Sequence, residues 1–135
     1  MLFLDMPSYR FPKNESLSSK KLWQEVFSKG TRLKAFPLVL QYHKCPLPEN
    51  VPVQAGFAVP KKSFGKAVDR NRIKRLMREA YRMEKPGFFN NIEGSYAFVF
   101  LYLGKEMPDF PDVSRAVKSL LKNFNEHEHE EAVEK

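Results

Sequence analysis

The chain has 135 residues, 42% of them hydrophobic and 13% aromatic, which is enough for one packed core, short for two, and excludes a largely disordered chain. Its formal net charge of +7 at pH 7 indicates an anionic partner, and a single cysteine, Cys45, excludes an internal disulfide and a cysteine-cluster metal site. No apolar run reaches the roughly 18 residues that a membrane span needs, and the first residues are too short for a signal peptide, so we expect a cytoplasmic protein with no membrane contact.

The N-terminal part predicts an arm followed by a helix. Residues 1 to 15 mix apolar side chains with two prolines and show no period, so we interpret them as an extended N-terminal arm. Residues 16 to 30 predict a short amphipathic helix, with a serine as its N-terminal cap and Gly30 at its end. Its apolar side consists of Leu22, Trp23, Val26 and Phe27.

Two strands are predicted next. Side chains alternate from Phe36 to His43, with Phe36, Leu38, Leu40 and Tyr42 on one face. After a loop at 45–50, a second strand spans about 51–59, and small residues lie on one of its faces. We expect the two strands to pair as a hairpin with one large apolar face and one shallow face on which a flat ligand fits.

The segment from 61 to 82 holds nine Lys and Arg against two acids, a balance that equals the charge of the whole chain. The rest of the chain sums to zero, so we assign the basic character to this one segment. At about 100° per residue, it predicts a helix with an apolar side and a basic side. The apolar side holds Ile73, Leu76, Met77, Ala80 and Tyr81, and the basic side Asn71, Arg72, Lys74, Arg75, Arg78 and Arg82. Because the basic side lacks interleaved acids, it indicates binding to phosphates rather than an ordinary solvated helix.

The last third predicts a strand and a helix. Residues 84–94 are rich in Gly, Pro and Asn and predict a loop, and the apolar run from Tyr96 to Leu103 predicts a central strand buried on both faces. A helix is predicted by the spacing of Val113, Val117, Leu120, Leu121 and Phe124. Residues 126–135 form an acidic C-terminal tail, which leaves 16–125 as a single α+β domain.

The basic segment also resembles a known family. The sequence AVDRNRIKRLMREAYR at 67–82, preceded by GFAVPKK at 56–62, resembles the RNR signature of the bacterial ribonuclease P protein subunit. LWQEVFSKG at 22–30 is similar to the first helix of that family, and the resemblance spans about residues 10 to 124. It implies a compact α/β sandwich with a four-stranded, mostly antiparallel sheet, three helices and a left-handed crossover, contrary to the usual hand.

The resemblance further implies a function. The chain would be the protein component of ribonuclease P, the endoribonuclease that removes the 5′ leader from precursor tRNA, and its partners would be the ribonuclease P RNA and that leader. Hydrolysis would belong to the RNA subunit and its Mg²⁺ ions. The protein alone would bind no cofactor or metal, supply no catalytic residue and need no obligate protein partner.

The same resemblance assigns site residues. The RNA-binding residues would be Lys61, Lys62, Arg70, Asn71, Arg72, Lys74, Arg75 and Arg78. A cleft between the first helix and the sheet would hold the single-stranded leader, with Trp23 and Phe27 as stacking surfaces, since such strands are held by aromatic platforms beside basic grooves. Packing in the core is the alternative role for both rings.

Two other functions compete with this assignment. A protein-only nuclease needs gathered carboxylates or a histidine pair, and the sequence offers His43 alone on a strand and His127 and His129 in the acidic tail, so we assign no catalysis to the protein itself. A ribosomal-type or other structured-RNA-binding protein would use the same basic helix without a role in tRNA processing.

Overall fold

The computed structural model describes residues 11–48, 51–89 and 92–134, with side chains through residue 128. Along these residues the elements are α1 (Lys20–Lys29), β1 (Thr31–Ala35), β2 (Leu38–Lys44), β3 (Val53–Ala58), α2 (Ala67–Glu84), β4 (Tyr96–Tyr102) and α3 (Phe110–Glu134). Two short 3₁₀ turns, Lys13–Glu15 and Lys85–Gly87, precede α1 and follow α2.

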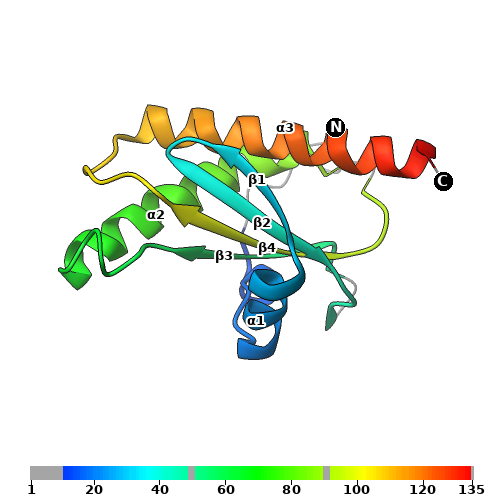
Figure 1. Cartoon of the computed structure of the whole chain (residues 1–135), viewed down its shortest axis with the longest axis horizontal. Coiled ribbons are helices and arrows are strands. Elements are labelled where there is room, and N and C mark those ends of the chain that lie inside the picture. The colour runs from blue at the N-terminus through cyan, green and yellow to red at the C-terminus, as the bar shows by residue number, and fades with distance from the viewer. Residues whose placement is uncertain (1–10, 49–50, 90–91, 135) are drawn as a thin grey trace, which may run out of the picture.

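The four strands form one sheet in the order β1-β2-β4-β3. The β1–β2 and β2–β4 pairs are antiparallel, and β3 and β4 run parallel. One face of the sheet carries α1, and the other carries α2 and α3 (Figure 1). This arrangement confirms the predicted α+β sandwich. The β3–α2–β4 unit is the place of the crossover that the resemblance implies to be left-handed.

The predicted strand at 36–43 is wrong at its start. The chain makes a hairpin there, with β1 before the turn and β2 after it, and the two-residue turn consists of Phe36 and Pro37, whose peptide bond is cis. Phe36 is 74% exposed rather than part of the core face. The short strand β1 was the fourth strand that the residue pattern did not reveal.

The predicted hairpin between β2 and β3 is also wrong. β4 lies between these two strands and pairs with both, because its side chains are apolar enough to be buried on both faces. The prediction of a central strand at 96–103 is therefore confirmed, and the shallow face of β3 exists but lies under α1 rather than at an open surface. Residues 49–50 and 90–91 of the predicted loops lie outside the described residues.

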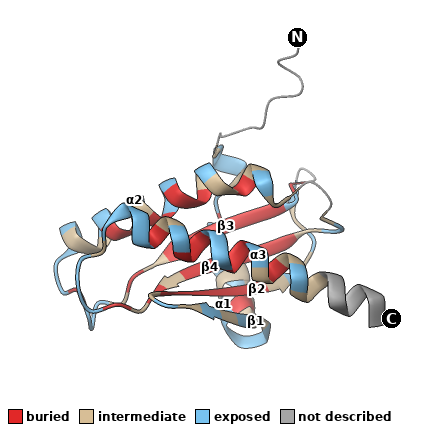
Figure 2. Ribbon diagram, turned by 90° about the horizontal axis from the view of Figure 1, so that it is seen from above, coloured by how far each residue is buried: buried red, intermediate tan, exposed pale blue. Residues whose placement is uncertain are grey.

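The main core lies between the sheet and the two long helices, where their buried sides meet (Figure 2). On α2, the fully buried residues are Ile73, Met77, Ala80 and Tyr81, while Leu76 packs at the edge of the cluster. All five residues that predicted the last helix are buried on α3: Val113, Val117, Leu120, Leu121 and Phe124. A smaller cluster on the opposite face joins Leu17 and Val26 to two β4 residues, Ala97 and Val99. The two clusters fix the orientation of every helix on the sheet.

Both ends of the domain are tied to its body. Phe11 packs against Tyr81 with ring centroids 5.7 Å apart, and Glu15 forms an ion pair with the buried Lys85. Residues 1–10 of the predicted arm lie outside the described residues. At the other end, the acidic stretch is not a separate tail, because α3 continues to Glu134 and two tyrosine hydroxyls donate hydrogen bonds to Glu128, from Tyr42 at 3.0 Å and from Tyr96 at 2.6 Å.

Replacing Met77 by alanine tests the packing of α2. Met77 is fully buried, so Met77→Ala leaves a cavity and should lower the free energy of unfolding by about 2–5 kcal/mol. The matched variant Arg75→Ala removes an exposed side chain of the same helix and should change stability by less than about 0.5 kcal/mol. Urea unfolding followed by circular dichroism measures both, and equal losses would show that the faces of α2 are assigned wrongly.

Candidate RNA-binding surface

The basic side of α2 is turned away from the core. Because Ile73, Met77 and Ala80 are buried on one side of the helix, the residues on the opposite side face solvent. The exposed residues of the predicted RNA-binding set are Lys61, Lys62, Asn71, Arg72, Arg75 and Arg78, and Lys74 is half-buried. The structure therefore gathers these residues on one helix and the turn before it, as predicted.

The N-terminal end of α2 adds backbone donors to this surface. Lys66 occupies the cap position with no side-chain hydrogen bond to the first turn, so no side chain of the described chain caps this end. Uncapped N–H groups and the helix dipole both favour an anion at a helix N terminus. Lys61 and Lys62 lie in the turn just before this end.

Arg70 differs from its neighbours. Its Nη1 donates hydrogen bonds to the backbone carbonyl oxygens of Phe64 at 2.8 Å and Gly65 at 2.9 Å, so its guanidinium group holds the turn that leads into α2. Two donors of one guanidinium group are used in this way, and the rest of the fork stays available to a ligand. We conclude that Arg70 orders the basic surface as well as adding charge to it.

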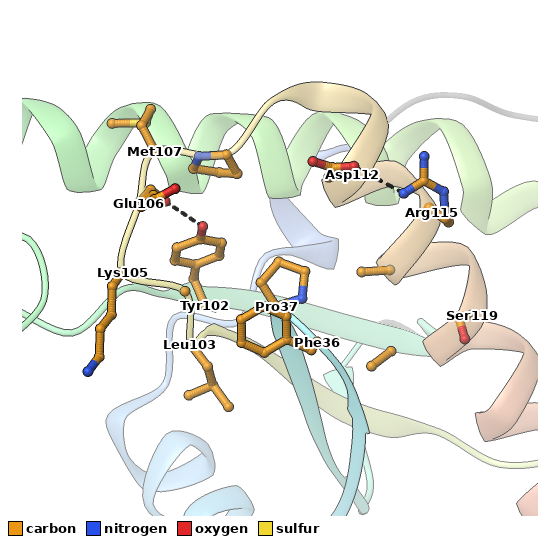
Figure 3. Close-up of a pocket in the computed structure, with 14 residues that line it drawn as sticks. Phe36, Pro37, Tyr102, Leu103, Lys105, Glu106, Met107, Asp112, Arg115 and Ser119 are labelled. Carbon is orange, nitrogen blue, oxygen red and sulfur yellow. Dashed lines mark hydrogen bonds and ion pairs between the residues drawn. The ribbon is translucent and has the colours of Figure 1, made fainter.

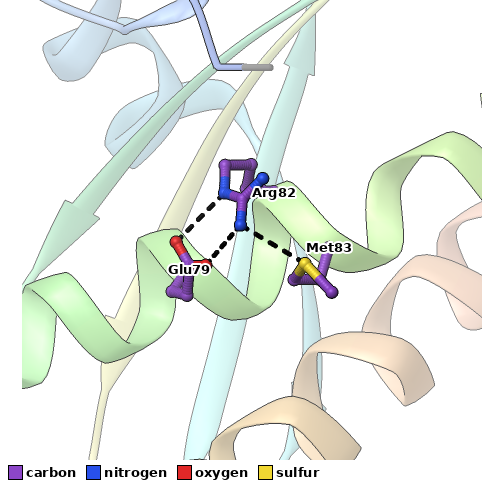
Figure 4. A network of polar contacts seen from close by, with 3 residues as sticks. All are labelled: Glu79, Arg82 and Met83. Atoms are coloured by element: carbon purple, nitrogen blue, oxygen red, sulfur yellow. Dashed lines mark hydrogen bonds and ion pairs between the residues drawn. The ribbon is translucent and has the colours of Figure 1, made fainter. Parts of the chain in front are cut away.

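Arg82 also has a partner, contrary to the expectation of a basic side without acids. Glu79, three residues before it, accepts a hydrogen bond from Arg82 Nε at 3.0 Å and pairs with its Nη2, which also contacts the sulfur of Met83 (Figure 4). This hydrogen bond lowers the pKa of the Glu79 carboxyl and raises that of Arg82. Among the basic residues from 61 to 82, Arg82 alone forms an ion pair within the described residues.

Arg70→Ala separates support of the turn from binding of phosphates. Loss of two charge-assisted hydrogen bonds should lower the free energy of unfolding by about 1–3 kcal/mol, and the lost charge should weaken RNA binding. Arg72→Ala, the control, should weaken RNA binding without this loss of stability because Arg72 makes no such contact. Urea unfolding and filter binding measure the two effects, and equal stability of both variants would contradict the role of Arg70 in the turn.

The predicted leader cleft lies on the other face of the sheet, on α1. Ser19 caps this helix, since its Oγ accepts a hydrogen bond from the N–H of Leu22 at 3.3 Å, and Gly30 ends it as predicted. A side chain at Gly30 would meet the carbonyl oxygen of Val26 at 2.3 Å, which explains why the chain can turn there into β1. Between these two ends, the apolar side of α1 packs against β4, and Trp23 reaches Gly56 on β3.

Trp23 and Phe27 form an aromatic pair on α1. Their ring centroids lie 6.0 Å apart with an angle of 29° between the planes. Trp23 is half-buried, and its Nε1–H donates a hydrogen bond to the carbonyl oxygen of Leu17 at 2.9 Å, whereas Phe27 is 48% exposed. The indole ring is thus held in place by the fold and supports a second ring that is open to solvent.

Gly56 on β3 gives the indole ring its space. A Cβ atom at this position would lie 2.4 Å from Cζ2 of Trp23 and 2.9 Å from its Cη2, so the ring lies directly against the backbone of the strand. The small residues that the sequence placed on this face of β3 therefore accommodate an aromatic ring of the protein itself. Core packing explains Trp23 in part, and the exposed ring of Phe27 is the better stacking surface.

Gly56→Ala tests this contact. The added methyl group should displace the indole ring, the chain's single tryptophan, and so change its fluorescence while the domain stays folded. Gly87→Ala is the matched control, because a Cβ at Gly87 meets nothing within 4 Å. Tryptophan emission and circular dichroism measure the outcome. An unchanged emission spectrum in Gly56→Ala would contradict the described position of Trp23.

Other features of the described chain lie apart from these two surfaces. A hollow of about 770 Å³ is lined by the β1–β2 turn, the loop after β4 and the start of α3, where Tyr102 donates a hydrogen bond to the carbonyl of Glu106 at 2.6 Å (Figure 3). It contains none of the predicted site residues. Within the described residues, no three His, Cys, Asp or Glu side chains gather as metal ligands, and no helix there is long and apolar enough to span a bilayer.

An α+β sandwich with exposed arginines along one side of a long helix is typical of a small nucleic-acid-binding protein. Comparison with known proteins identifies the family within that class. The family model described as ribonuclease P matches residues 11–125. The chain is 37% identical to the ribonuclease P protein component of Chlorobaculum tepidum over 125 residues, covering 84% of this chain and 81% of that protein.

Two further comparisons agree. Identity with the ribonuclease P protein component of Porphyromonas gingivalis is 35% over 121 residues, covering 86% of this chain and 88% of the relative. The solved structure of the RNase P protein from Thermotoga maritima superposes with a TM-score of 0.65 at 28% identity, covering 81% and 96% of the two chains. The chain belongs to the bacterial ribonuclease P protein family.

Family membership settles the coarse function. The chain is a subunit of the endoribonuclease ribonuclease P and a partner of its RNA. The ribosomal-type alternative is thereby excluded. The individual roles of the α2 and α1 residues remain predictions.

Proposed function

We propose that the protein binds the catalytic RNA of ribonuclease P through the basic side of α2, and the single-stranded 5′ leader of precursor tRNA beside α1. In this way it promotes endonucleolytic removal of the leader and maturation of the tRNA 5′ end. Hydrolysis of the phosphodiester belongs to the RNA and the Mg²⁺ ions that it holds. The protein contributes binding and charge neutralisation.

The observation that carries the proposal is the set of unpaired cations on α2. Arg72, Arg75 and Arg78 are exposed on a helix whose other side is fixed in the core, and no ion pair in the described chain neutralises them. Like charges held this closely repel one another in the free protein. Phosphates relieve that repulsion and release their own counterions, which makes the binding favourable and dependent on salt.

The three arginines differ in how freely their side chains can reach RNA phosphates. Arg78 has its guanidinium carbon 5.7 Å from the centre of the Phe57 ring, so it is partly held against β3. Arg72 and Arg75 are exposed and form no ion pair within the described residues. Arginine suits phosphate because its planar fork of donors matches two oxygens at once. Arg72 and Arg75 are accordingly the residues that we assign most directly to RNA phosphates.

The exposed ring of Phe27 supports the assignment of the leader to α1. Stacking of a base on an aromatic ring contributes about 1–3 kcal/mol and tolerates any base, which suits binding of a single strand regardless of its sequence. Trp23 fixes the orientation of Phe27 through the stacked pair. The leader thus meets a rigid platform on the face of the sheet opposite to α2.

Cleavage of precursor tRNA at low magnesium by the catalytic RNA tests the function. Addition of the protein should stimulate cleavage, and the stimulation should shrink when the leader is trimmed to one nucleotide. Phe27→Ala should lose most of the leader-dependent part, while Phe36→Ala, which removes another exposed phenylalanine far from α1, should retain it. No stimulation with any substrate would contradict the proposal.

A further inference from the structure

A second group of cations lies outside the basic helix. Residues 13–44 hold seven Lys and Arg against two acids, Glu15 and Glu25, whereas residues 84–135 hold ten acids against six Lys and Arg. Outside 61–82 the chain therefore has a basic part, which contains α1, β1 and β2, and an acidic part, which contains α3; together with one net negative charge on the remaining residues they sum to zero. The basic residues therefore do not all lie in the segment 61–82, contrary to the expectation from the sequence.

Three of these cations follow one another at the junction of α1 and β1. Lys29 is the last residue of α1, and Arg32 and Lys34 lie on β1; all three side chains are exposed. Arg32 and Lys34 are two residues apart on a strand, so they point to the same face about 7 Å apart. We call Lys29, Arg32 and Lys34 the β1 strip.

The pairing register places the β1 strip on the α1 face of the sheet. Arg32 lies opposite Gln41, which lies opposite Val99, a member of the small cluster under α1. The strip is thus on the face opposite to α2 and α3 (Figure 1). The strip lies at one edge of the sheet, on β1, whereas Gly56, on which Trp23 packs, lies at the other edge, on β3.

No acid of the described chain neutralises the strip. The three ion pairs there involve Arg82, Lys85 and Arg115, and none involves a residue of the strip. Of the two acids in this part of the chain, Glu15 is paired with Lys85, and Glu25, one helical turn before Lys29, forms no ion pair within the described residues. The strip therefore presents uncompensated charge to solvent, as α2 does.

We propose that the β1 strip is a second phosphate-binding surface, and that it contacts the folded catalytic RNA rather than the leader; this rests on the proposed function. Single strands are held by aromatic platforms, and none of the three residues of the strip is aromatic, whereas folded RNA is recognised through shape and backbone phosphates. Phe36, the nearby exposed ring, lines the hollow next to α3 instead (Figure 3). The RNA then contacts two faces of the protein, the α2 face and the α1 face.

Edge strands also carry lysine simply to prevent pairing with other chains, so the test must separate that role from RNA binding. The test uses the full-length protein and the catalytic RNA transcript without substrate, from 50 to 200 mM salt. The triple variant Lys29→Ala/Arg32→Ala/Lys34→Ala should bind at least about tenfold more weakly, and its salt slope should fall by about two units if two to three phosphate contacts are lost.

Matched variants complete the design. Lys105→Ala/Lys118→Ala/Lys122→Ala removes three exposed lysines from the acidic part and should bind within about twofold of the unchanged protein, since none of the residues assigned to RNA binding belongs to that part. A charge-preserving variant, Lys29→Arg/Arg32→Lys/Lys34→Arg, should retain the affinity, which guards against effects on the fold of β1. Loss of affinity in the charge-preserving variant would overturn the proposal.

The α2 variant Arg72→Ala/Arg75→Ala distinguishes the two levels of failure. If it loses affinity while the triple variant of the β1 strip binds like the lysine control, the second surface is refuted and the proposed function stands. If neither loses affinity, the proposed function itself fails. If the strip variant binds the catalytic RNA normally but the assembled enzyme loses its preference for a leader, the strip serves the substrate and the proposal is equally overturned.

Discussion

The packing of α2 on the sheet is the constraint on which the rest of the molecule depends. Ile73, Met77, Ala80 and Tyr81 are buried, and this fixes the rotation of the helix about its axis. Rotation cannot relieve the repulsion among the arginines on the other side, because it would pull the apolar side out of the core. The burial energy of the sandwich thus holds a row of like charges in a fixed order, ready for a polyanion before one arrives.

Preorganisation extends to the other face in a different form. Trp23 is fixed by a backbone hydrogen bond and by the flat space over Gly56, and it in turn orients Phe27. An aromatic ring that is already immobile loses little entropy when a base stacks on it. Both surfaces are therefore held in place by residues behind them: the buried side of α2 behind the arginines, and Trp23 behind Phe27.

Sequence periodicity predicted α1, α2, β4 and the start of α3, because in each the apolar residues recur with the period of the element. The pattern does not reveal β1, since its five residues alternate between half-buried and exposed and carry too little apolar signal. It also wrongly predicts that β2 pairs with β3, because the sequence of a strand does not show which strand it pairs with. The contact between Glu128 and Tyr42 spans 86 positions, so no local pattern contains it. A sum of charge along the chain does not show where the charges lie in space. The fold places the basic side of α2 and the β1 strip on opposite faces of the sheet (Figure 1).

The place of β4 also has a consequence for synthesis of the protein. It is the last strand in the chain yet an inner strand of the sheet, and β3 pairs with no other strand. As the chain leaves the ribosome, β1, β2, β3 and α2 emerge while the strand that joins them is still inside. The apolar side of α2 then has no complete sheet to cover it, and the main core is complete only after α3 has emerged as well. Since such non-local pairing is slow, the nascent chain exposes that apolar surface until the sandwich forms.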